Sequence, residues 1–311
     1  MPSTGTSSPE TTATGAPRPG GPGLLAGRTV SRVGYGAMQL RENTDLATGV
    51  AMLRRVVELG VDHIDTAEFY GPANEFIREA IRPEDGVLVA SKVGADPDPG
   101  APVPLRLAQR PEELRASVEA NLKSLGMDRI PLVNLRRTDA GPGVRAKGDQ
   151  VVDLDDQLAT MVALRDEGKI GAIGLSGVSL DVLRRALPAG IACVQNAYSL
   201  VSRDDDEILA LCTAEGIAWV PFFPLGGDIP GLPKVTDEQV VLDVAASLGS
   251  TPMQVGLAWL LHRAPNVLLI PGTSNADHLQ ANVDAGAIQL DAETLAALNA
   301  VPSRSGNIVL G

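Results

Sequence analysis

Apolar residues recur at helical spacing in several separate segments of the chain. In residues 45–59, Val50, Leu53 and Val57 fall on one face of a helix, and Gly60 follows the last of them. A glycine just past an amphipathic run is typical of a helix C-terminus. The same spacing predicts further helices over residues 73–81, 111–125, 154–167, 180–187, 204–215, 277–283 and 292–299, with two more separated near Gly249.

Short, uninterrupted apolar runs lie between these predicted helices. Runs of this length, bounded by turn residues, are typical of strands buried on both faces of a parallel sheet. They predict strands over residues 33–38, 61–64, 87–90, 132–135, 171–175, 192–194, 218–222 and 267–270. Strands that alternate with helices in this way predict an α/β fold, a (β/α)8 TIM barrel in a single domain.

The first 23 residues differ in composition from the rest of the chain. They are almost entirely Pro, Gly, Ser, Thr and Ala, with Arg18 as their one basic residue. Such a segment buries too little apolar surface to offset its ordering entropy. We therefore expect a disordered tail over residues 1–23, with the features of neither a secretory signal nor a transit peptide, and a barrel over residues 24–311.

The overall composition argues against several classes of partner. The chain has 311 residues, 44% of them hydrophobic, and a net charge of -12. An acidic chain without a Lys- or Arg-rich block is not expected to bind nucleic acid, and no apolar run reaches the length of a membrane span. Cys193 and Cys212 form no metal or redox spacing. We therefore expect no metal site and a reducing, cytoplasmic location.

The candidate chemistry lies at the ends of two predicted strands. The segment VDHIDTAEFYG places Asp65 at the end of one strand and Tyr70 in the following loop, and VLVASK places Lys92 at the end of the next strand. The carboxyl ends of parallel strands meet at one mouth of a barrel, where barrel enzymes carry their chemistry. An ammonium beside a phenol favours loss of the phenolic proton, and Asp65 would hold that ammonium. Each residue alone also has a plainer interpretation, as a turn or capping aspartate, a pocket aromatic or a solvated lysine.

Two other enzyme signatures are incomplete. Gly34 and Gly36 are not followed by the third glycine and helix start of a doubly wound dinucleotide fingerprint. Ser176 in GLSG is followed by Val178 where a nucleophile elbow carries glycine, and no histidine lies in a run that suggests a serine hydrolase triad.

The motif HIDTAEFYG, followed by a strand that ends in SK, resembles the aldo-keto reductases. The resemblance covers residues 28–300, which is nearly the whole chain. It implies a barrel enzyme that uses NADPH to reduce aldehydes and ketones. It also implies that Tyr70 is the general acid and that Lys92 and Asp65 tune it.

One position departs from the family pattern. Where these reductases usually carry a histidine after a leucine, the run LVNLRRTDA has Arg136. Arg136 could donate to a developing alkoxide, or it could only pair with an acid such as Asp139. The runs VNLR, VQNAYS, WVPFFPLGG and LLIPGTS resemble the branch that contains bacterial pyridoxal reductases, where the histidine is also not kept. This likeness implies pyridoxal as the leading specific substrate.

The family resemblance assigns nicotinamide contacts to residues at the strand ends. These implied contacts are Ala37, Met38, Asp65, Ser176, Gln195 and Phe222, the last of which could instead be a core aromatic. Gly177 stands where the family usually has an asparagine that shares in holding the carboxamide. Leu225, Gly226 and Gly227 would cross the pyrophosphate, and Tyr198 would line the pocket.

The turn in LLIPGTSNADHLQANVDA is a second sequence feature that predicts a binding site, in this case for an anion. A Gly-Thr-Ser turn that enters a helix offers backbone N–H groups, hydroxyls and a positive helix end. By the resemblance, Gly272, Thr273 and Ser274 would bind the adenosine 2'-phosphate and Asn282 the adenine. His278 stands where arginine is frequent and is mostly neutral at pH 7, so the expected preference for NADPH over NADH is modest. The plainer interpretation is an ordinary capped helix.

The sequence is also compatible with two other functions. The missing histidine motivates a cofactor-binding sensor or regulatory subunit that has lost turnover. A reductase of a sugar or antibiotic intermediate would need a larger pocket, shaped by residues 96–109 and 139–150. The expected partner of an active enzyme is a small-molecule carbonyl compound. The sequence predicts neither the fold of these two loops nor the oligomeric state.

Overall fold

A parallel sheet of seven strands forms the centre of the computed structural model, which describes residues 9–41, 44–101, 104–139, 144–226 and 232–304. Its strand order is β3-β4-β5-β8-β9-β10-β11. The strands are β3 (Tyr35–Gly36), β4 (His63–Asp65), β5 (Leu88–Val93), β8 (Ile130–Arg136), β9 (Ile170–Ser176), β10 (Ile191–Gln195) and β11 (Ala218–Trp219). Every neighbouring pair in this sheet is parallel, as the uninterrupted apolar runs predict.

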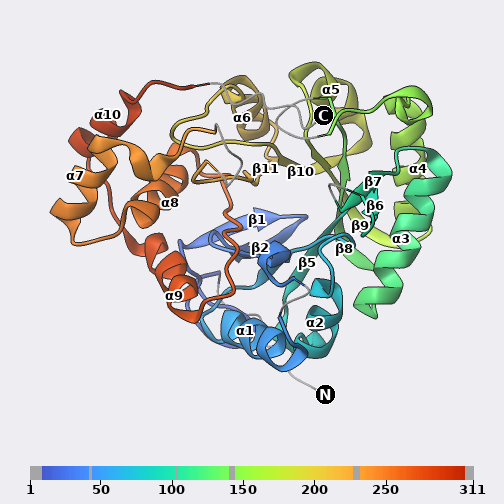
Figure 1. The fold of residues 1–311 in the computed structure, drawn as a ribbon, viewed down its shortest axis with the longest axis horizontal. Coiled ribbons are helices and arrows are strands. Elements are labelled where there is room, and N and C mark those ends of the chain that lie inside the picture. The colour runs from blue at the N-terminus through green and yellow to red at the C-terminus, as the bar shows by residue number, and fades with distance from the viewer. Residues whose placement is uncertain (1–8, 42–43, 102–103, 140–143, 227–231, 305–311) are drawn as a thin grey trace.

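The segment around Leu269 closes this sheet into a barrel. Trp219 at the end of β11 forms a parallel bridge with Val267, and Val33 just before β3 forms one with Leu269. The N–H of Gly34 donates to the carbonyl of Leu269 at 2.7 Å. An eighth strand position therefore lies between β11 and β3, and the predicted (β/α)8 barrel is confirmed (Figure 1). The first and last strands, predicted over residues 33–38 and 267–270, are largely reduced to such bridges.

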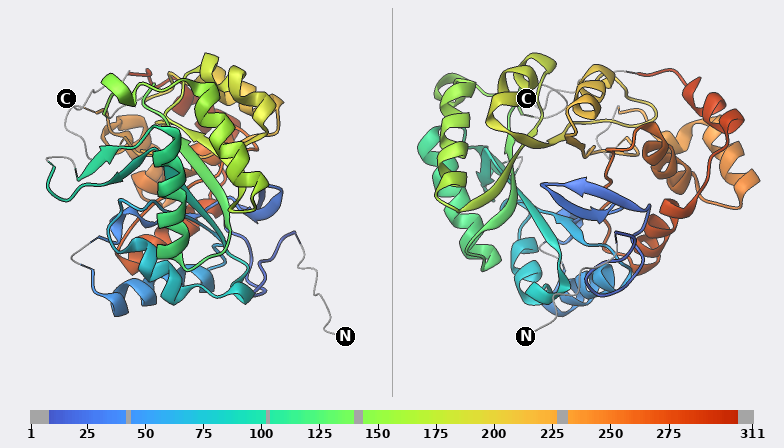
Figure 2. Two further views of the ribbon diagram at one scale, coloured as in Figure 1. Left: turned by 90° about the vertical axis from the view of Figure 1, so that its right-hand side faces the viewer. Right: turned by 180° about the vertical axis from the view of Figure 1, so that it is seen from behind.

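Helices surround the barrel, as Figures 1 and 2 show. They are α1 (Leu46–Glu58), α2 (Ala73–Ala80), α3 (Pro111–Leu125), α4 (Leu154–Asp166), α5 (Leu180–Ala186), α6 (Asp206–Ala214), α7 (Gln239–Leu248), α8 (Pro252–Arg263), α9 (Ala276–Asp284) and α10 (Ala292–Asn299). The eight helices with predicted bounds end within two residues of them, and α7 and α8 are separated at Gly249 as predicted, because local signals mark the ends. Asp45 caps α1 by accepting from the N–H of Thr48, and Gly126 ends α3 in the left-handed conformation.

A hairpin that the sequence analysis missed covers the amino end of the barrel. Strands β1 (Pro22–Leu25) and β2 (Arg28–Ser31) pair antiparallel and cross the centre of the ring (Figure 2, right). Leu25 and Val30 pack against inward-facing barrel residues, which include Leu88, Leu132 and Leu268. This packing leaves the carboxyl ends of the strands as the mouth. A second unpredicted hairpin, β6 (Ala95–Pro97) with β7 (Leu105–Leu107), follows β5.

The expectation of a disordered tail is wrong for residues 9–23. Thr11 and Pro17 form an antiparallel bridge, and Arg18 is buried against the barrel with its Nε donating to Asp62 Oδ2 at 3.0 Å. The carbonyls of Pro9 and Thr11 also accept from Arg18. A low apolar content does not exclude order when one buried cation organises the segment through polar contacts. Residues 1–8 lie outside the described part of the chain.

Replacing Arg18 with Met is expected to lower the free energy of unfolding by about 3 kcal/mol, because it leaves the Asp62 carboxylate buried without its cation. Urea unfolding would measure the loss. The control is Arg55→Met. Arg55 lies on the exposed face of α1, and its ion pair with Glu58 is solvated and is expected to contribute less than about 1 kcal/mol. An Arg18→Met protein as stable as the wild type would contradict the burial of this pair.

Neither membrane-spanning helices nor metal ligands are evident in the ranges described above. No single helix there is long and apolar enough to cross a membrane, although α7 and α8, bent by 96°, meet a length and composition criterion as a pair. No group of three or more His, Cys, Asp or Glu side chains in those ranges could hold a metal ion.

Candidate active site

Asp65 and Lys92 form a buried ion pair at the mouth. Asp65 is the last residue of β4, and Lys92 lies in the neighbouring strand β5, which extends farther than predicted. Lys92 Nζ donates to Asp65 Oδ1 and, at 3.1 Å, to the carbonyl of Thr66. Burial alone would lower the pKa of Lys92, but the charges of Asp65 and Tyr70 outweigh it and raise the pKa. Lys92 is therefore a cation at neutral pH.

Tyr70 lies beside this cation, in the loop that follows β4. Lys92 Nζ is 5.1 Å from the centroid of the Tyr70 ring. The ring of Phe69 meets Tyr70 edge-on, with centroids 5.0 Å apart. The loop turns at this point because the N–H of Tyr70 donates to the carbonyl of Ala67 at 3.0 Å. The structure thus brings together the three residues of the predicted proton-transfer set, with the Lys92 cation beside the Tyr70 ring.

Arg136 ends β8 at the same mouth and forms no ion pair with any residue that the structure describes. Its neighbour Arg137 pairs with Asp139, donating from Nη2 to Oδ1 at 3.0 Å, so the alternative that Arg136 pairs with Asp139 is wrong. Arg136 Nη1 is buried and has no hydrogen-bond partner within the described ranges. Its Cζ lies 5.5 Å from the centroid of the Phe69 ring. Burial lowers the pKa of Arg136, and the nearby Tyr70 opposes that shift.

Gln195 links the buried ion pair to the end of β10. Its Nε2 donates to Asp65 Oδ2 at 2.7 Å, while its Oε1 is buried with no partner among the residues described. Ser176 is aligned with Gln195 in the neighbouring strand β9, and Gly177 follows with a φ of 67°. The site therefore presents one buried amide oxygen as a free acceptor. Nothing in the sequence signals the contact between Gln195 and Asp65, which are 130 residues apart.

The other residues expected near the nicotinamide also lie at strand ends. Ala37 and Met38 form a short 3-10 turn directly after β3. Phe222 is partly exposed and bridges to Ala197, so it is not a core aromatic. Phe223 has a positive φ of 54°, which is uncommon for an aromatic residue and fits a turn that presents side chains at a site.

The expected pyrophosphate loop is described only in part. Leu225 and Gly226 follow Phe223, and Gly226 N–H donates to the carbonyl of Phe223 at 2.9 Å. Only glycine fits at 226, because a Cβ there would lie 2.0 Å from the carbonyl oxygen of Pro233. Gly227 lies outside the described residues.

Tyr198 does not line the mouth, and that expectation is wrong. It is 1% exposed, and its ring stacks on Trp259 and meets Trp219 edge-on. Its hydroxyl donates to Asp206 Oδ1 and accepts from Arg263 Nε at 3.0 Å. The side chain points from the strand end into the packing between the barrel and α8, where an aromatic ring with one polar tip is well satisfied.

The turn before α9 is tightly packed against β3. Gly272 is required there, because a Cβ would lie 2.5 Å from the carbonyl oxygen of Gly36. Thr273 is buried, and its carbonyl accepts from the hydroxyl of Tyr35 at 2.6 Å. Ser274 is exposed.

The first turn of α9 has a protein cap. Asn275 accepts from the N–H groups of Asp277 and His278 at 2.8 and 3.1 Å. Asp277 places a negative charge in this turn, His278 is exposed, and Asn282 lies farther along the helix. The capped helix is thus what the described residues show, and the phosphate and adenine contacts stay predictions.

A buried network of polar side chains, which we call the asparagine network, packs beneath the loop that carries Tyr70. Thr66 Oγ1 donates to Asn74 Oδ1 at 2.8 Å, and Asn74 Nδ2 donates to Asn121 Oδ1 at 3.2 Å. Ser91 Oγ donates to the same Asn121 oxygen at 2.6 Å, and Glu68 accepts from Asn74 at 3.1 Å. The network therefore joins residues next to the ion pair to the loop that carries the tyrosine. Sequence reasoning missed it because asparagines on two different helices share no motif.

An Asn121→Ala variant is expected to lose about 2 kcal/mol of unfolding free energy, because buried donors on Ser91 and Asn74 lose their acceptor. Chemical denaturation would measure this loss. Lys123→Ala on the exposed side of the same helix is the matched control and should change stability by less than about 0.5 kcal/mol. Equal stability of the two variants would show that the asparagine network is not a buried unit.

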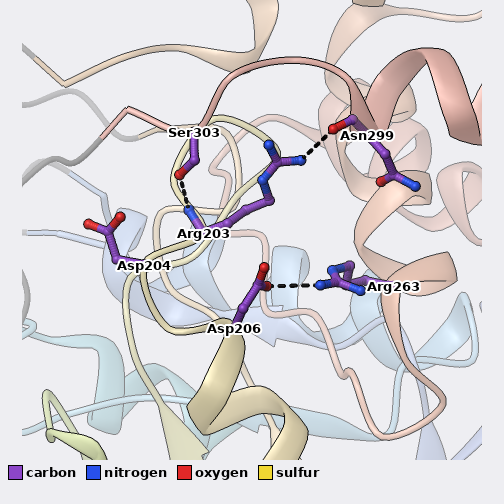
Figure 3. A pocket seen from close by; sticks show the side chains of 6 residues that line it. All are labelled: Arg203, Asp204, Asp206, Arg263, Asn299 and Ser303. Carbon is purple, nitrogen blue, oxygen red and sulfur yellow. Dashed lines mark hydrogen bonds and ion pairs between the residues drawn. The ribbon is translucent and has the colours of Figure 1, made fainter.

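A polar cavity of about 500 Å³ lies apart from the predicted site residues (Figure 3). Its lining residues are Arg203, Asp204, Asp206, Arg263, Asn299 and Ser303. Arg203 donates to the carbonyl of Asn299 at 3.1 Å and through its N–H to Ser303 Oγ at 2.8 Å. Arg263 pairs with Asp206 at 3.0 Å. These contacts fasten the segment that follows α10, so the cavity has a structural explanation.

Asp205, at the start of α6, gives a pH-dependent prediction. Burial, with smaller contributions from the charges of Asp204 and Asp206, raises its pKa to about 6 against the opposing effect of the hydrogen bond from Asn196. The folded state therefore holds this proton more tightly than the unfolded state, and stability falls as pH rises from about 4 to about 6. Asp205→Asn should raise the unfolding free energy by about 1–2 kcal/mol at pH 7 and hardly at all near pH 4. Urea titrations at the two pH values test this, and an equal effect at both would contradict it.

Comparisons with known proteins agree with this arrangement. The model of the Aldo/keto reductase family matches residues 32–302. Pyridoxine 4-dehydrogenase of Escherichia coli is 40% identical over 287 residues, which cover 89% of this chain and 96% of that protein. An uncharacterized oxidoreductase of Schizosaccharomyces pombe is 35% identical, with 87% and 86% covered. The crystal structure of an aldo/keto reductase from Klebsiella pneumoniae in complex with NADP and acetate has a TM-score of 0.74 and 26% identity, with 92% of this chain and 98% of that chain covered.

Proposed function

The chain belongs to the aldo/keto reductase family, and from that membership we propose that it is an NADPH-dependent reductase of aldehydes or ketones, with pyridoxal as its leading substrate. The observation that carries the proposal is the buried pair of Asp65 and Lys92 beside Tyr70 at the mouth of the barrel. A phenol held next to a buried ammonium is suited to give a proton to a carbonyl oxygen.

The residues at the mouth fit a nicotinamide cofactor. The buried Oε1 of Gln195 has no partner in the described part of the chain and is an acceptor for the N–H2 of a carboxamide. Phe222 is partly exposed at the next strand end and offers a ring face for stacking. A K. pneumoniae relative was solved with NADP, which supports the same cofactor class here. When bound, NADPH supplies a hydride to the carbonyl carbon.

The protein's own residues carry the proton. Tyr70 gives its hydroxyl proton to the carbonyl oxygen, the carbonyl becomes an alcohol, and the phenolate takes a proton back from solvent. Lys92 stabilises the transient phenolate. Asp65 keeps Lys92 charged and in place, and Gln195 holds the other oxygen of Asp65. Arg136 provides a further positive donor beside the carbonyl.

Pyridoxal is the leading substrate because of the pyridoxine 4-dehydrogenase likeness, since the oxidation named for that relative is the reverse of pyridoxal reduction. The test is NADPH consumption by the purified protein with pyridoxal, beside benzaldehyde and a control without substrate. Strongly preferred turnover of pyridoxal supports the proposal. NADPH binding without turnover of any carbonyl compound would favour a cofactor-binding sensor. Preference for a bulky sugar or antibiotic intermediate would retain the enzyme class and reject pyridoxal.

A further inference from the structure

Arg136 is a partly buried cation at the end of β8. Its Nη1 is buried and makes no hydrogen bond, and no ion pair of this side chain occurs in the described part of the chain. Enclosing one nitrogen of a charged guanidinium without a partner is costly, so this side chain is suited to bind an anion from outside the protein. The opposite charge would come from the substrate or the cofactor.

Among the residues that the structure describes, the carboxylates of Asp65 and Asp139 are already committed and do not supply that anion. Asp65 uses one carboxylate oxygen for Lys92 and the other for Gln195. Asp139 pairs with Arg137. Lys92 and Arg136 therefore place two cations at the mouth against one committed carboxylate, in a chain whose net charge is -12. This positive site is local and does not reflect a generally basic protein.

Arg136 also lies close to where the carbonyl would be protonated. Lys92 is over the Tyr70 ring, the ring of Phe69 meets Tyr70 edge-on, and Arg136 is over Phe69 at 5.5 Å. An anion bound by Arg136 would therefore lie next to the carbonyl oxygen that Tyr70 protonates. Phe69 and Tyr70 are both partly exposed, so their rings can border a flat aromatic substrate. An ionised hydroxyl on the ring carbon next to the carbonyl-bearing carbon has this geometry.

We propose that Arg136 binds an ionised oxygen of the substrate, so that the enzyme selects aromatic carbonyl compounds with an acidic hydroxyl on the adjacent carbon. The inference rests on the proposed function and refines it. A neutral carbonyl oxygen would leave the buried guanidinium uncompensated before reaction, whereas a phenolate neutralises it. Pyridoxal carries a phenolic oxygen at this position. Arg136 then selects the substrate through its ionised oxygen and also donates to the carbonyl oxygen.

Three matched aldehydes test the proposal. They are 3-hydroxypyridine-4-carbaldehyde, its 3-methoxy ether and pyridine-4-carbaldehyde, each assayed with NADPH. The wild type should prefer the hydroxy compound over both others by about tenfold or more in kcat/KM, the scale of a hydrogen bond to a charged group. In Arg136→Met that ratio should fall to about one, and Arg136→Lys, which keeps the charge, should retain part of it. Equal values for the three aldehydes in the wild type, or an undiminished ratio in Arg136→Met, would overturn the proposal.

The matched control is Arg137→Met, which removes the neighbouring arginine that is already paired with Asp139. It should keep the substrate ratio even where it lowers stability. A lost ratio in this variant too would assign the effect to general disturbance of the β8 end.

A readout without turnover separates this inference from the proposed function. 3-Hydroxypyridine bound to the NADP+-loaded protein should show the absorbance of its ionised form at a pH where the free compound is neutral, and Arg136→Met should abolish that shift. Absence of the shift in the wild type would reject the anion site. If no aldehyde is reduced but the shift is present, the proposed function fails and the anion site stands.

Discussion

A Tyr70→Phe protein is expected to reduce pyridoxal with a kcat/KM at least about a hundredfold below that of the wild type, because general acid catalysis contributes on that scale. The phenylalanine keeps the ring that lies over Lys92 and removes only the oxygen that carries the proton. Binding of NADPH, measured by fluorescence titration, should change little. Steady-state assays with pyridoxal measure the loss.

Tyr198→Phe is the matched control for this change. It removes a hydroxyl that is bonded to Asp206 and Arg263 in the packing beside α8, away from the mouth. Its kcat/KM should stay within about threefold of the wild type, since its effect is on stability. If Tyr70→Phe retained full activity with an aldehyde, Tyr70 would not be the general acid.

The second large effect is expected from Lys92→Met. Removing the ammonium leaves the Asp65 carboxylate buried without its cation, which should lower the free energy of unfolding by about 3–5 kcal/mol and abolish measurable reduction. The double variant Asp65→Leu with Lys92→Met removes both charges. It should recover much of the stability and none of the activity, which separates catalysis from folding. A double variant as unstable as the single one would contradict this explanation.

The same pair predicts a pH dependence of stability. The pKa of Lys92 is raised in the folded protein, despite burial, by Asp65 and Tyr70. Its contribution is fully present below the unfolded pKa of about 10.4 and is lost as pH rises through the higher folded value. The wild type should therefore lose stability relative to the double variant above about pH 10.5. Urea unfolding of both proteins at neutral and strongly alkaline pH measures this, and a constant difference would contradict it.

Much of the fold could be predicted because local signals and burial agree in this chain. The apolar run at Leu88 predicted a strand buried on both faces, and β5 is buried throughout. Glycines such as Gly126 and Gly249 lie at the ends of helices. The placement of Asp65 and Lys92 at one mouth followed from parallel strand order alone. Tyr70 followed from its place in the loop after β4.

The rest depended on contacts that sequence spacing does not encode. Residues 9–23 are ordered by the buried Arg18, whose partner Asp62 is 44 residues away. A prediction from composition does not include a single long-range contact of this kind, so it gave disorder for these residues. Tyr198 was expected at the mouth, but its hydroxyl is hydrogen-bonded to Asp206 and Arg263 in the packing beside α8. In the described part of the chain, Asp139 pairs with Arg137 and leaves Arg136 without an ion pair, which the sequence does not indicate.

The proposed reaction transfers a hydride from a nicotinamide to a carbonyl carbon at the mouth of this barrel. It can be followed with NADPH that carries deuterium at C4 of the nicotinamide in one stereochemical form, with pyridoxal as substrate and mass spectrometry of the product. We expect pyridoxine with a single deuterium on the new carbinol carbon, and none when the other stereochemical form is used. Alcohol without deuterium from either form, or no alcohol while NADPH is bound, would contradict it.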